Sequence, residues 1–230
     1  MSCLAVLPTA VGDRMELPCT FLYVNTEAVN GSWLACGFVF CCDRMKAHNS
    51  KLHLIHDPVL GERKDIIMKV AFLDRDGTIN RDYPDDMWSQ IQNPEILPGA
   101  IRGMQFLKEK GYEIIIVTNQ YIIGEGMISI EQYHEFNRKL LALLIENDIR
   151  ILDVFYCPHA RDEQCDCCKP RNGLIKQAIR KYPEINLEES LMCGDSLSDM
   201  ECAESAGLNF LGIGIGKQRM SDLSDLCNLI

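Results

Sequence analysis

The chain has 230 residues, a net charge of −10, a mean hydropathy near zero and 12 cysteines. Because an acidic protein repels phosphate backbones, this charge argues against a nucleic-acid partner. No apolar run reaches the ~18 residues that a membrane-spanning helix needs, and the first residues do not show the basic region and long apolar core typical of a secretory signal, so we expect a cytoplasmic protein with no membrane partner. In such a protein the cysteines favour metal ligation or free thiols over disulfides.

Residues 1–67 differ in pattern from the rest of the chain. They show no clear periodicity apart from an apolar run that predicts a strand over 33–42. They contain six basic and seven acidic side chains, so the remaining 163 residues carry a net charge of −9. We interpret 1–67 as an N-terminal extension, either an added and poorly ordered segment or a small subdomain, and 68–230 as the regular domain.

From Met68 onward, short apolar runs alternate with amphipathic segments, which is typical of an α/β fold with a parallel sheet. The expected strands are 69–74, 113–119, 151–157, 190–195 and 209–214. The expected helices are 98–110, 129–147, 172–182 and 197–206. Ser129 and Gln132 fit a capping box at the start of the second helix. The predicted fold is a Rossmann-like parallel sheet flanked by helices.

Two aspartates stand at the end of the first expected strand, in the sequence FLDRDGTIN over 72–80. Ligands of open α/β sheets bind at the carboxyl ends of the strands. Asp74 and Asp76 could therefore hold a divalent cation and face a substrate there. An Asp-Gly pair alone indicates only a turn, but two aspartates followed by Gly77 and Thr78 favour a functional site.

A second candidate site lies in the sequence CPHARDEQCDCC, over 157–168. Its close pairs, Cys157 with His159 and Cys165 with Cys167, could direct four ligands at one centre. Three thiolates and one imidazole suit a closed, structural Zn²⁺ site. The alternative is a set of free thiols in a loop, and the compact spacing favours zinc. Cys168 is then a spare thiol.

Four segments in chain order resemble the motifs of the haloacid dehalogenase (HAD) superfamily of phosphatases. The first is the run Asp-Arg-Asp-Gly-Thr, and the second is the strand end at Thr118. The third contains Lys169, and the fourth, CGDSLSDM, contains Asp195 and Asp199. Each motif follows an expected strand, and together they are a much stronger signal than any one alone.

The resemblance implies a role for each of these residues. Asp74 is the nucleophile that forms an aspartyl-phosphate, and Asp76 is the general acid and then the general base. Thr118 and Lys169 bind the phosphoryl oxygens. The implied Mg²⁺ ligands are Asp74, Asp195 and the backbone carbonyl of Asp76. Asp199 is expected to orient a metal-bound water or Lys169.

The chain further resembles one branch of the superfamily, the heptose 1,7-bisphosphate 7-phosphatases and the related histidinol-phosphate phosphatases. The resemblance covers Met68 to the C-terminus and rests on Asp-Arg-Asp-Gly-Thr-Ile-Asn, Thr-Asn-Gln, Cys-x-His…Cys-x-Cys and Lys-Pro. It implies a minimal cap and a zinc loop that partly covers the site. The implied substrate-binding residues are Arg75, Asp82, Tyr83, Pro84, Asp85, Asn119, Gln120, Tyr121 and Cys168.

Three positions depart from the branch pattern. Cys168 stands where the heptose enzymes place an arginine, Glu125 replaces another positive residue, and Ser196 stands where lysine is frequent. These changes remove positive charge near the site. They leave the choice of a bisphosphate substrate open without affecting the phosphatase chemistry.

We therefore predict a Mg²⁺-dependent phosphomonoester hydrolase with a structural Zn²⁺. Its best substrate candidate is D-glycero-D-manno-heptose 1,7-bisphosphate, and the alternative is histidinol phosphate or another small metabolite. From a different class, the chain could be a zinc-loop binding module with a degenerate phosphatase site. Retention of the five motif side chains Asp74, Asp76, Thr118, Lys169 and Asp195 argues against degeneration. We expect a monomer whose partner is a small phosphorylated metabolite.

Overall fold

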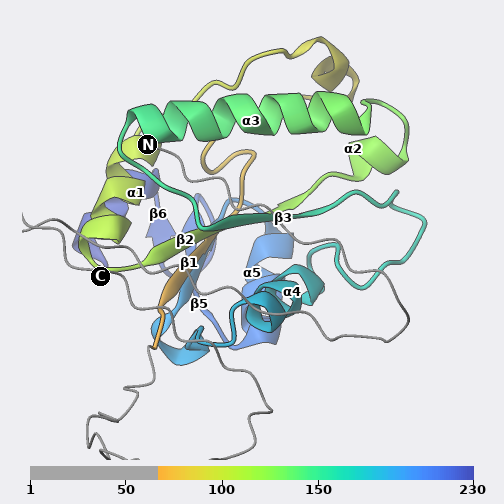
Figure 1. Ribbon diagram of the computed structural model, residues 1–230. Helices are drawn as coiled ribbons and strands as arrows, with labels where there is room; N and C mark the ends of the chain where they lie inside the picture. Colours follow the sequence, from red (N-terminus) through yellow and green to blue (C-terminus); the bar gives the residue numbers. More distant parts are fainter. Residues whose placement is uncertain (1–66) are drawn as a thin grey trace, which may run out of the picture. The chain divides into compact units, whose positions relative to one another are not determined.

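The structure, a computed structural model, describes residues 67–230. The expected division of the chain at residue 67 and the strand expected over 33–42 concern residues outside this described part. Six parallel strands form one sheet in the order β3-β2-β1-β4-β5-β6 (Figure 1). The strands are β1 (Val70–Leu73), β2 (Glu113–Asn119), β3 (Asp153–Cys157), β4 (Leu191–Gly194), β5 (Asn209–Ile213) and β6 (Arg219–Met220).

Helices connect the first five strands, and a short loop joins β5 to β6. The α-helices are α1 (Ala100–Glu109), α2 (Tyr121–Gly124), α3 (Ile130–Glu146), α4 (Gly173–Lys181) and α5 (Leu197–Ala206). Three short 3₁₀ segments are η1 (Asp85–Gln90), η2 (Leu187–Glu189) and η3 (Leu223–Asn228). Within residues 67–230, none of the helices has both the length and the apolar character needed to cross a membrane.

The strands are apolar on both sides because both faces of the sheet are covered. Leu73 and Ile116 belong to a core that α1 and α3 complete with Met104, Leu107, Leu140 and Leu144. Phe72 and Ile115 belong to a second core that α4 and α5 complete with Leu174, Ile175, Ala178, Cys202 and Ala203. The helices thus lie on opposite faces of the sheet (Figure 1), and the predicted fold class is confirmed.

Most element boundaries agree closely with those expected from the sequence. The strand over 113–119 and the helix over 197–206 are reproduced, and the other expected strands are one or two residues shorter than expected. The capping box also forms: Gln132 N donates to Ser129 Oγ at 3.2 Å and Ser129 N donates to Gln132 Oε1 at 2.8 Å. Helix α2 and strand β6 were not predicted, since four and two residues are too short to show a period.

The strand order brings the motif residues to one edge. Strand β1 lies between β2 and β4, with Leu73 in register with both Ile116 and Cys193. The chain direction is the same in all three strands, so their carboxyl ends open at the same edge. Asp74, Thr118 and Asp195 stand at or just after these ends, where ligands of such sheets bind.

Candidate active site

Three carboxylates converge at this edge of the sheet. Asp74 follows β1, Asp195 follows β4, and Asp199 lies in the first turn of α5. One oxygen from each lies within 4.8 Å of the others. Asp74 and Asp199 are buried, with 7% and 1% of their surfaces exposed. Such a group of buried carboxylates needs positive charge close by.

Lys169 supplies part of that positive charge. Its Nζ donates to Asp74 Oδ1, to Asp199 Oδ1 at 2.5 Å and to the Val117 carbonyl at 3.0 Å. Burial would lower the pKa of this lysine, but Asp74 and Asp199 raise it above its ordinary value. The ammonium is therefore held in its charged form, fixed between the first and fourth sequence motifs.

One ammonium does not balance three carboxylates. Burial raises the pKa of Asp74 well above its ordinary range, despite the opposing charge of Lys169. Burial, followed by the Asp199 charge, also raises the pKa of Asp195 to about 6. A divalent cation would favour the ionised carboxylates here, and oxygen ligands of this kind are those that Mg²⁺ prefers. The donor set therefore fits Mg²⁺.

Gly77 lets the loop after β1 approach this cluster. Its φ of +84° is in the left-handed region, and a Cβ built there would lie 2.0 Å from Asp195 Oδ2. Any side chain would therefore clash with Asp195 as well as strain the backbone. The Asp-Gly sequence is a turn, as its composition indicates, and it also holds Asp76 beside the acidic cluster.

Asp76 is held by several donors. Arg75 Nε and Nη2 donate to its carboxylate at 3.0 and 2.8 Å, and Gln120 Nε2 donates to Oδ2 at 2.9 Å. Asn80 Nδ2 lies 3.3 Å from Oδ1. Arg75 is 1% exposed. Its guanidinium is therefore buried beside Asp76, and substrate contact by Arg75 stays a prediction of the sequence resemblance.

Asn119 and Gln120 also contact the site from within. The Asn119 side chain forms two hydrogen bonds with the backbone of Lys169, at 2.9 and 3.0 Å. Gln120 Nε2 donates to Thr118 Oγ1 at 3.0 Å as well as to Asp76. These two side chains, at the end of β2 and just after it, thus hold the lysine, the threonine and the second aspartate in place. The substrate contact that the sequence resemblance implies for them stays a prediction.

The remaining candidate substrate residues lie around η1 and α2, except Cys168, which lies in the loop between β3 and α4. Tyr121 OH donates to Asp85 Oδ1 at 2.9 Å. Asp82 is exposed and precedes Tyr83, whose hydroxyl donates to Glu95 at 3.1 Å. Pro84 is exposed and immediately precedes η1. Cys168 is half-buried, and its Sγ donates to the Lys169 carbonyl at 3.5 Å.

Sequence reasoning missed an ionic network among the residues around η1 and α2, which form the rim of the site. Arg161 lies in the loop over 157–168, which we call the cysteine loop. It forms two hydrogen bonds with the Glu125 carboxylate, at 2.6 and 2.7 Å. Its guanidinium carbon lies 4.3 Å from the Tyr121 ring centroid, and Nη2 lies 3.4 Å from Asp85. In the sequence, the only sign of this pair is that the two residues have opposite charges. Residues 36 positions apart form no local pattern that would predict their contact. The network joins the cysteine loop to α2 and η1.

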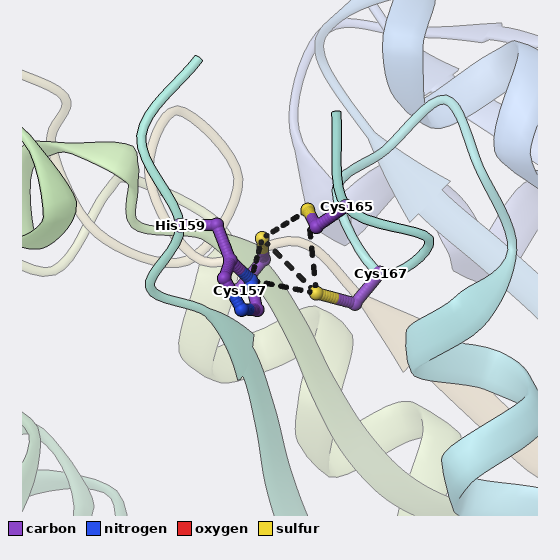
Figure 2. A group of neighbouring side chains, drawn as sticks. All are labelled: Cys157, His159, Cys165 and Cys167. Atoms are coloured by element: carbon purple, nitrogen blue, oxygen red, sulfur yellow. Dashed lines mark hydrogen bonds between the residues drawn. The ribbon is translucent and has the colours of Figure 1, made fainter. Parts of the chain in front are cut away.

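The cysteine loop brings its four predicted ligands together (Figure 2). Cys157 Sγ lies 3.4 Å from Cys165 Sγ and 3.2 Å from Cys167 Sγ, and His159 Nδ1 lies 3.1 Å from Cys167 Sγ. All four donor atoms fall within 4.8 Å of one another. Three sulfurs and one imidazole nitrogen around one point suit a closed Zn²⁺ site.

The same loop packs against α2. A Cβ on Gly124 would lie 2.3 Å from the Ala160 amide nitrogen and 2.7 Å from the Pro158 carbonyl. Only glycine permits this close approach. The cluster therefore anchors the loop at one end of α2, and Lys169 follows Cys167 by two residues.

A cavity of about 850 Å³ lies between this loop and α4. Its lining includes His159, Cys165, Arg171 and Lys176, but none of the catalytic candidates. The acidic cluster is therefore separate from this hollow. It occupies the open edge of the sheet, as expected for a fold with a minimal cap.

Comparisons with known proteins agree with this geometry. The HAD-hydrolase-like family model matches residues 166–227. The D-glycero-alpha-D-manno-heptose-1,7-bisphosphate 7-phosphatase of Photorhabdus laumondii is 39% identical over 148 residues, covering 61% of this chain and 79% of that protein. The corresponding beta-heptose enzyme of Haemophilus influenzae is 35% identical over 144 residues, covering 60% and 77%.

A solved structure supports the fold. The D,D-heptose 1.7-bisphosphate phosphatase from B. bronchiseptica, complexed with magnesium and phosphate, superimposes with a TM-score of 0.62 and 24% identity. The match covers 70% of this chain and 97% of that one. Together with the sequence relatives, these findings mean that the chain belongs to the HAD-like phosphatases, in the family of the heptose-1,7-bisphosphate 7-phosphatases.

Proposed function

We propose that this protein is a Mg²⁺-dependent phosphatase that removes the 7-phosphate of D-glycero-D-manno-heptose 1,7-bisphosphate through an aspartyl-phosphate on Asp74. The observation that carries the proposal is the buried contact of Lys169 with both Asp74 and Asp199, beside Asp195, at the carboxyl edge of the sheet. This arrangement suits a phosphate dianion, which needs a nucleophile and concentrated positive charge at one point.

In the first half of the reaction, an Asp74 carboxylate oxygen attacks phosphorus and the bond to the sugar oxygen breaks. Asp76 gives its proton to the departing alkoxide. Lys169 holds the Asp74 carboxylate and faces the phosphoryl oxygens, where negative charge concentrates in the transition state. Thr118 Oγ1 supports the same group, because Gln120 donates to that oxygen and leaves its hydroxyl proton free for a phosphoryl oxygen.

In the second half, Asp76 takes a proton from a water molecule, and this water attacks the phosphorus of the aspartyl-phosphate. The bond to Asp74 breaks, inorganic phosphate leaves and the carboxylate is restored. Asp76 can serve in both halves because it has given up its proton by the end of the first half and can then accept one from water. Asp76 fits this double role, since 14% of its side chain is exposed next to the buried Asp74.

The acidic cluster would hold Mg²⁺ through Asp74, Asp195 and the Asp76 carbonyl. The ion's contribution is to neutralise charge on the phosphoryl group during transfer. Asp199 lies behind Lys169 and fixes its ammonium by the 2.5 Å contact. We assign Zn²⁺ to Cys157, His159, Cys165 and Cys167, where four protein ligands leave no open position for catalysis.

The sugar specificity rests on the sequence relatives. They include enzymes named for the alpha and for the beta anomer of the heptose bisphosphate. The residues that would surround the sugar are those at the rim: Asp82, Tyr83, Pro84, Asp85, Tyr121 and Cys168.

The test is phosphate release by the purified full-length chain, with and without Mg²⁺, from both anomers of the heptose bisphosphate and from histidinol phosphate. The expected result is Mg²⁺-dependent turnover with the highest kcat/KM on one heptose anomer. A higher kcat/KM on histidinol phosphate would overturn the substrate assignment. No turnover of any ester would overturn the phosphatase assignment.

A further inference from the structure

Arg75 is a buried cation that the reaction described above does not use. It is 1% exposed and stands between the two catalytic aspartates in the sequence. A buried guanidinium is costly unless it is paired. Within residues 67–230, Asp76 is the one side chain to which it donates, through Nε and Nη2.

Three aromatic rings surround the guanidinium. Its central carbon lies 5.6 Å from the Trp88 ring centroid, 5.4 Å from that of Tyr133 and 5.1 Å from that of Phe136. Trp88 comes from η1, and the other two rings come from α3. Guanidinium groups stack on such rings, and the rings leave the group little room to move. This aromatic cage therefore fixes the position of Arg75.

The arginine in turn fixes Asp76. Two nitrogens of a planar fork that contact one carboxylate set its orientation as well as its distance. Gln120 Nε2 contacts the same carboxylate at 2.9 Å from the β2 side. The Asp76 side chain is still 14% exposed, so it remains open to a substrate. Arg75 and Gln120 thus hold the buried side of the Asp76 carboxylate, while its exposed side faces the site.

We infer that Arg75 and its aromatic cage of Trp88, Tyr133 and Phe136 form a positioning device that aims the Asp76 carboxylate at the leaving oxygen. The inference rests on the proposed function, in which Asp76 is the general acid and base. In this role Arg75 acts through Asp76, to which its buried guanidinium donates. A displacement of about 1 Å in a catalytic group can cost about 10²-fold in rate.

The test compares two esters that differ in their need for a general acid. The heptose bisphosphate releases a sugar alkoxide, which must be protonated, whereas p-nitrophenyl phosphate releases a stable phenolate. Arg75→Met should lower kcat/KM for the sugar ester by about 10²-fold and that for the nitrophenyl ester by less than about 10-fold. Arg75→Lys should be intermediate, because an ammonium cannot form the fork.

Two controls separate positioning from a structural effect. Arg138→Met removes a two-point pair with Glu135 on the exposed side of α3 and should change neither value. In an Asp76→Ala background, Arg75→Met should have almost no further effect on the sugar ester, because the residues act as a unit. The inference would be overturned if Arg75→Met lowered kcat/KM equally for both esters. It would also be overturned if Arg75→Met lowered kcat/KM for the sugar ester as much in the Asp76→Ala background as in the wild type.

A crystal structure of Arg75→Met, or of Arg75→Lys if the first variant does not fold, decides the question without turnover. The Asp76 carboxylate should be rotated or occupy more than one orientation. A single, unchanged orientation would overturn the inference. Failure of the wild type to hydrolyse the sugar ester would count against the proposed function alone, since this structural result does not depend on it.

Discussion

Asp74 and Asp76 are two residues apart in the sequence, yet they have different surroundings. Asp74 is 7% exposed and contacts the ammonium of Lys169. The Asp76 side chain is 14% exposed and is held by Arg75 and Gln120. Carboxylates in different environments commonly take different catalytic roles. The buried one suits the nucleophile, and the partly exposed one suits proton transfer.

Replacing each aspartate by asparagine should therefore give a different defect. Asp74→Asn should lower kcat by about 10⁴-fold or more, because an amide does not attack phosphorus. Asp76→Asn should slow both the formation and the hydrolysis of the aspartyl-phosphate. With an activated ester, whose leaving group needs no proton, the phosphoenzyme should accumulate. Rapid-quench measurement of protein-bound phosphate distinguishes the two. Near-normal turnover by Asp74→Asn would show that the covalent mechanism is wrong.

Substrate selectivity should respond to Cys168. The two arginines that could replace the missing one are engaged: Arg161 with Glu125 and Asp85, and Arg171 with the Cys165 carbonyl at 2.5 Å. Cys168→Arg should then raise the preference for the 1,7-bisphosphate over a matched monophosphate by about 10-fold, roughly one charge-assisted hydrogen bond.

The measurement is kcat/KM for both substrates in the wild type and in Cys168→Arg. Arg161→Gln is the matched control, and it should leave the ratio unchanged because Glu125 already holds that guanidinium. A loss of bisphosphate preference in Arg161→Gln would mean that Arg161 recognises the distal phosphate. An unchanged ratio in Cys168→Arg would place recognition elsewhere in the site.

At the scale of elements, the cysteine loop joins the proposed zinc site to Lys169. The loop begins at the end of β3, packs on α2 through Gly124 and leads directly into Lys169. The Asn119 side chain, at the end of β2, holds the backbone of that lysine by two hydrogen bonds. Loosening the loop should therefore misplace Lys169 without removing any catalytic group.

Elemental analysis should find about one zinc per chain, as a single four-ligand site requires. Cys165→Ser should lose this zinc, lower the Tm and reduce kcat, because the loop no longer holds Lys169 in place. Cys227→Ser changes an exposed cysteine in η3 and should leave all three unchanged. Full thermal stability and full activity in zinc-free protein would rule out the structural role.

The cap of α3 offers a prediction about stability alone. Ser129→Ala removes the acceptor for the Gln132 amide at the first turn of a 17-residue helix. The expected loss is about 1 kcal/mol of the free energy of unfolding, measured by urea denaturation. Activity should be unchanged, since the serine is exposed and outside the site. A loss of kcat without a loss of stability would contradict this.

At the scale of the whole molecule, every residue assigned to the site lies within the described part of the chain. A fragment of residues 68–230 should therefore fold and hydrolyse phosphate esters, because it contains the six described strands and the three hydrophobic clusters packed around them. The measurement is the Tm and the kcat/KM of the fragment against those of the full chain. An insoluble or inactive fragment, with an active full chain, would show that the preceding residues belong to the core.

The sequence by itself determined the α/β class, the boundaries of most elements and the candidates for both metal sites. These follow from local patterns: apolar runs that mark strands, aspartates just after them, and ligands spaced within one loop. Only the tertiary structure decided where Arg75 points, how Arg161 pairs with Glu125 and what Asn119 holds. Each depends on strand order or helix packing between distant segments. The aromatic cage, for example, forms only because η1 and α3 meet over the loop after β1.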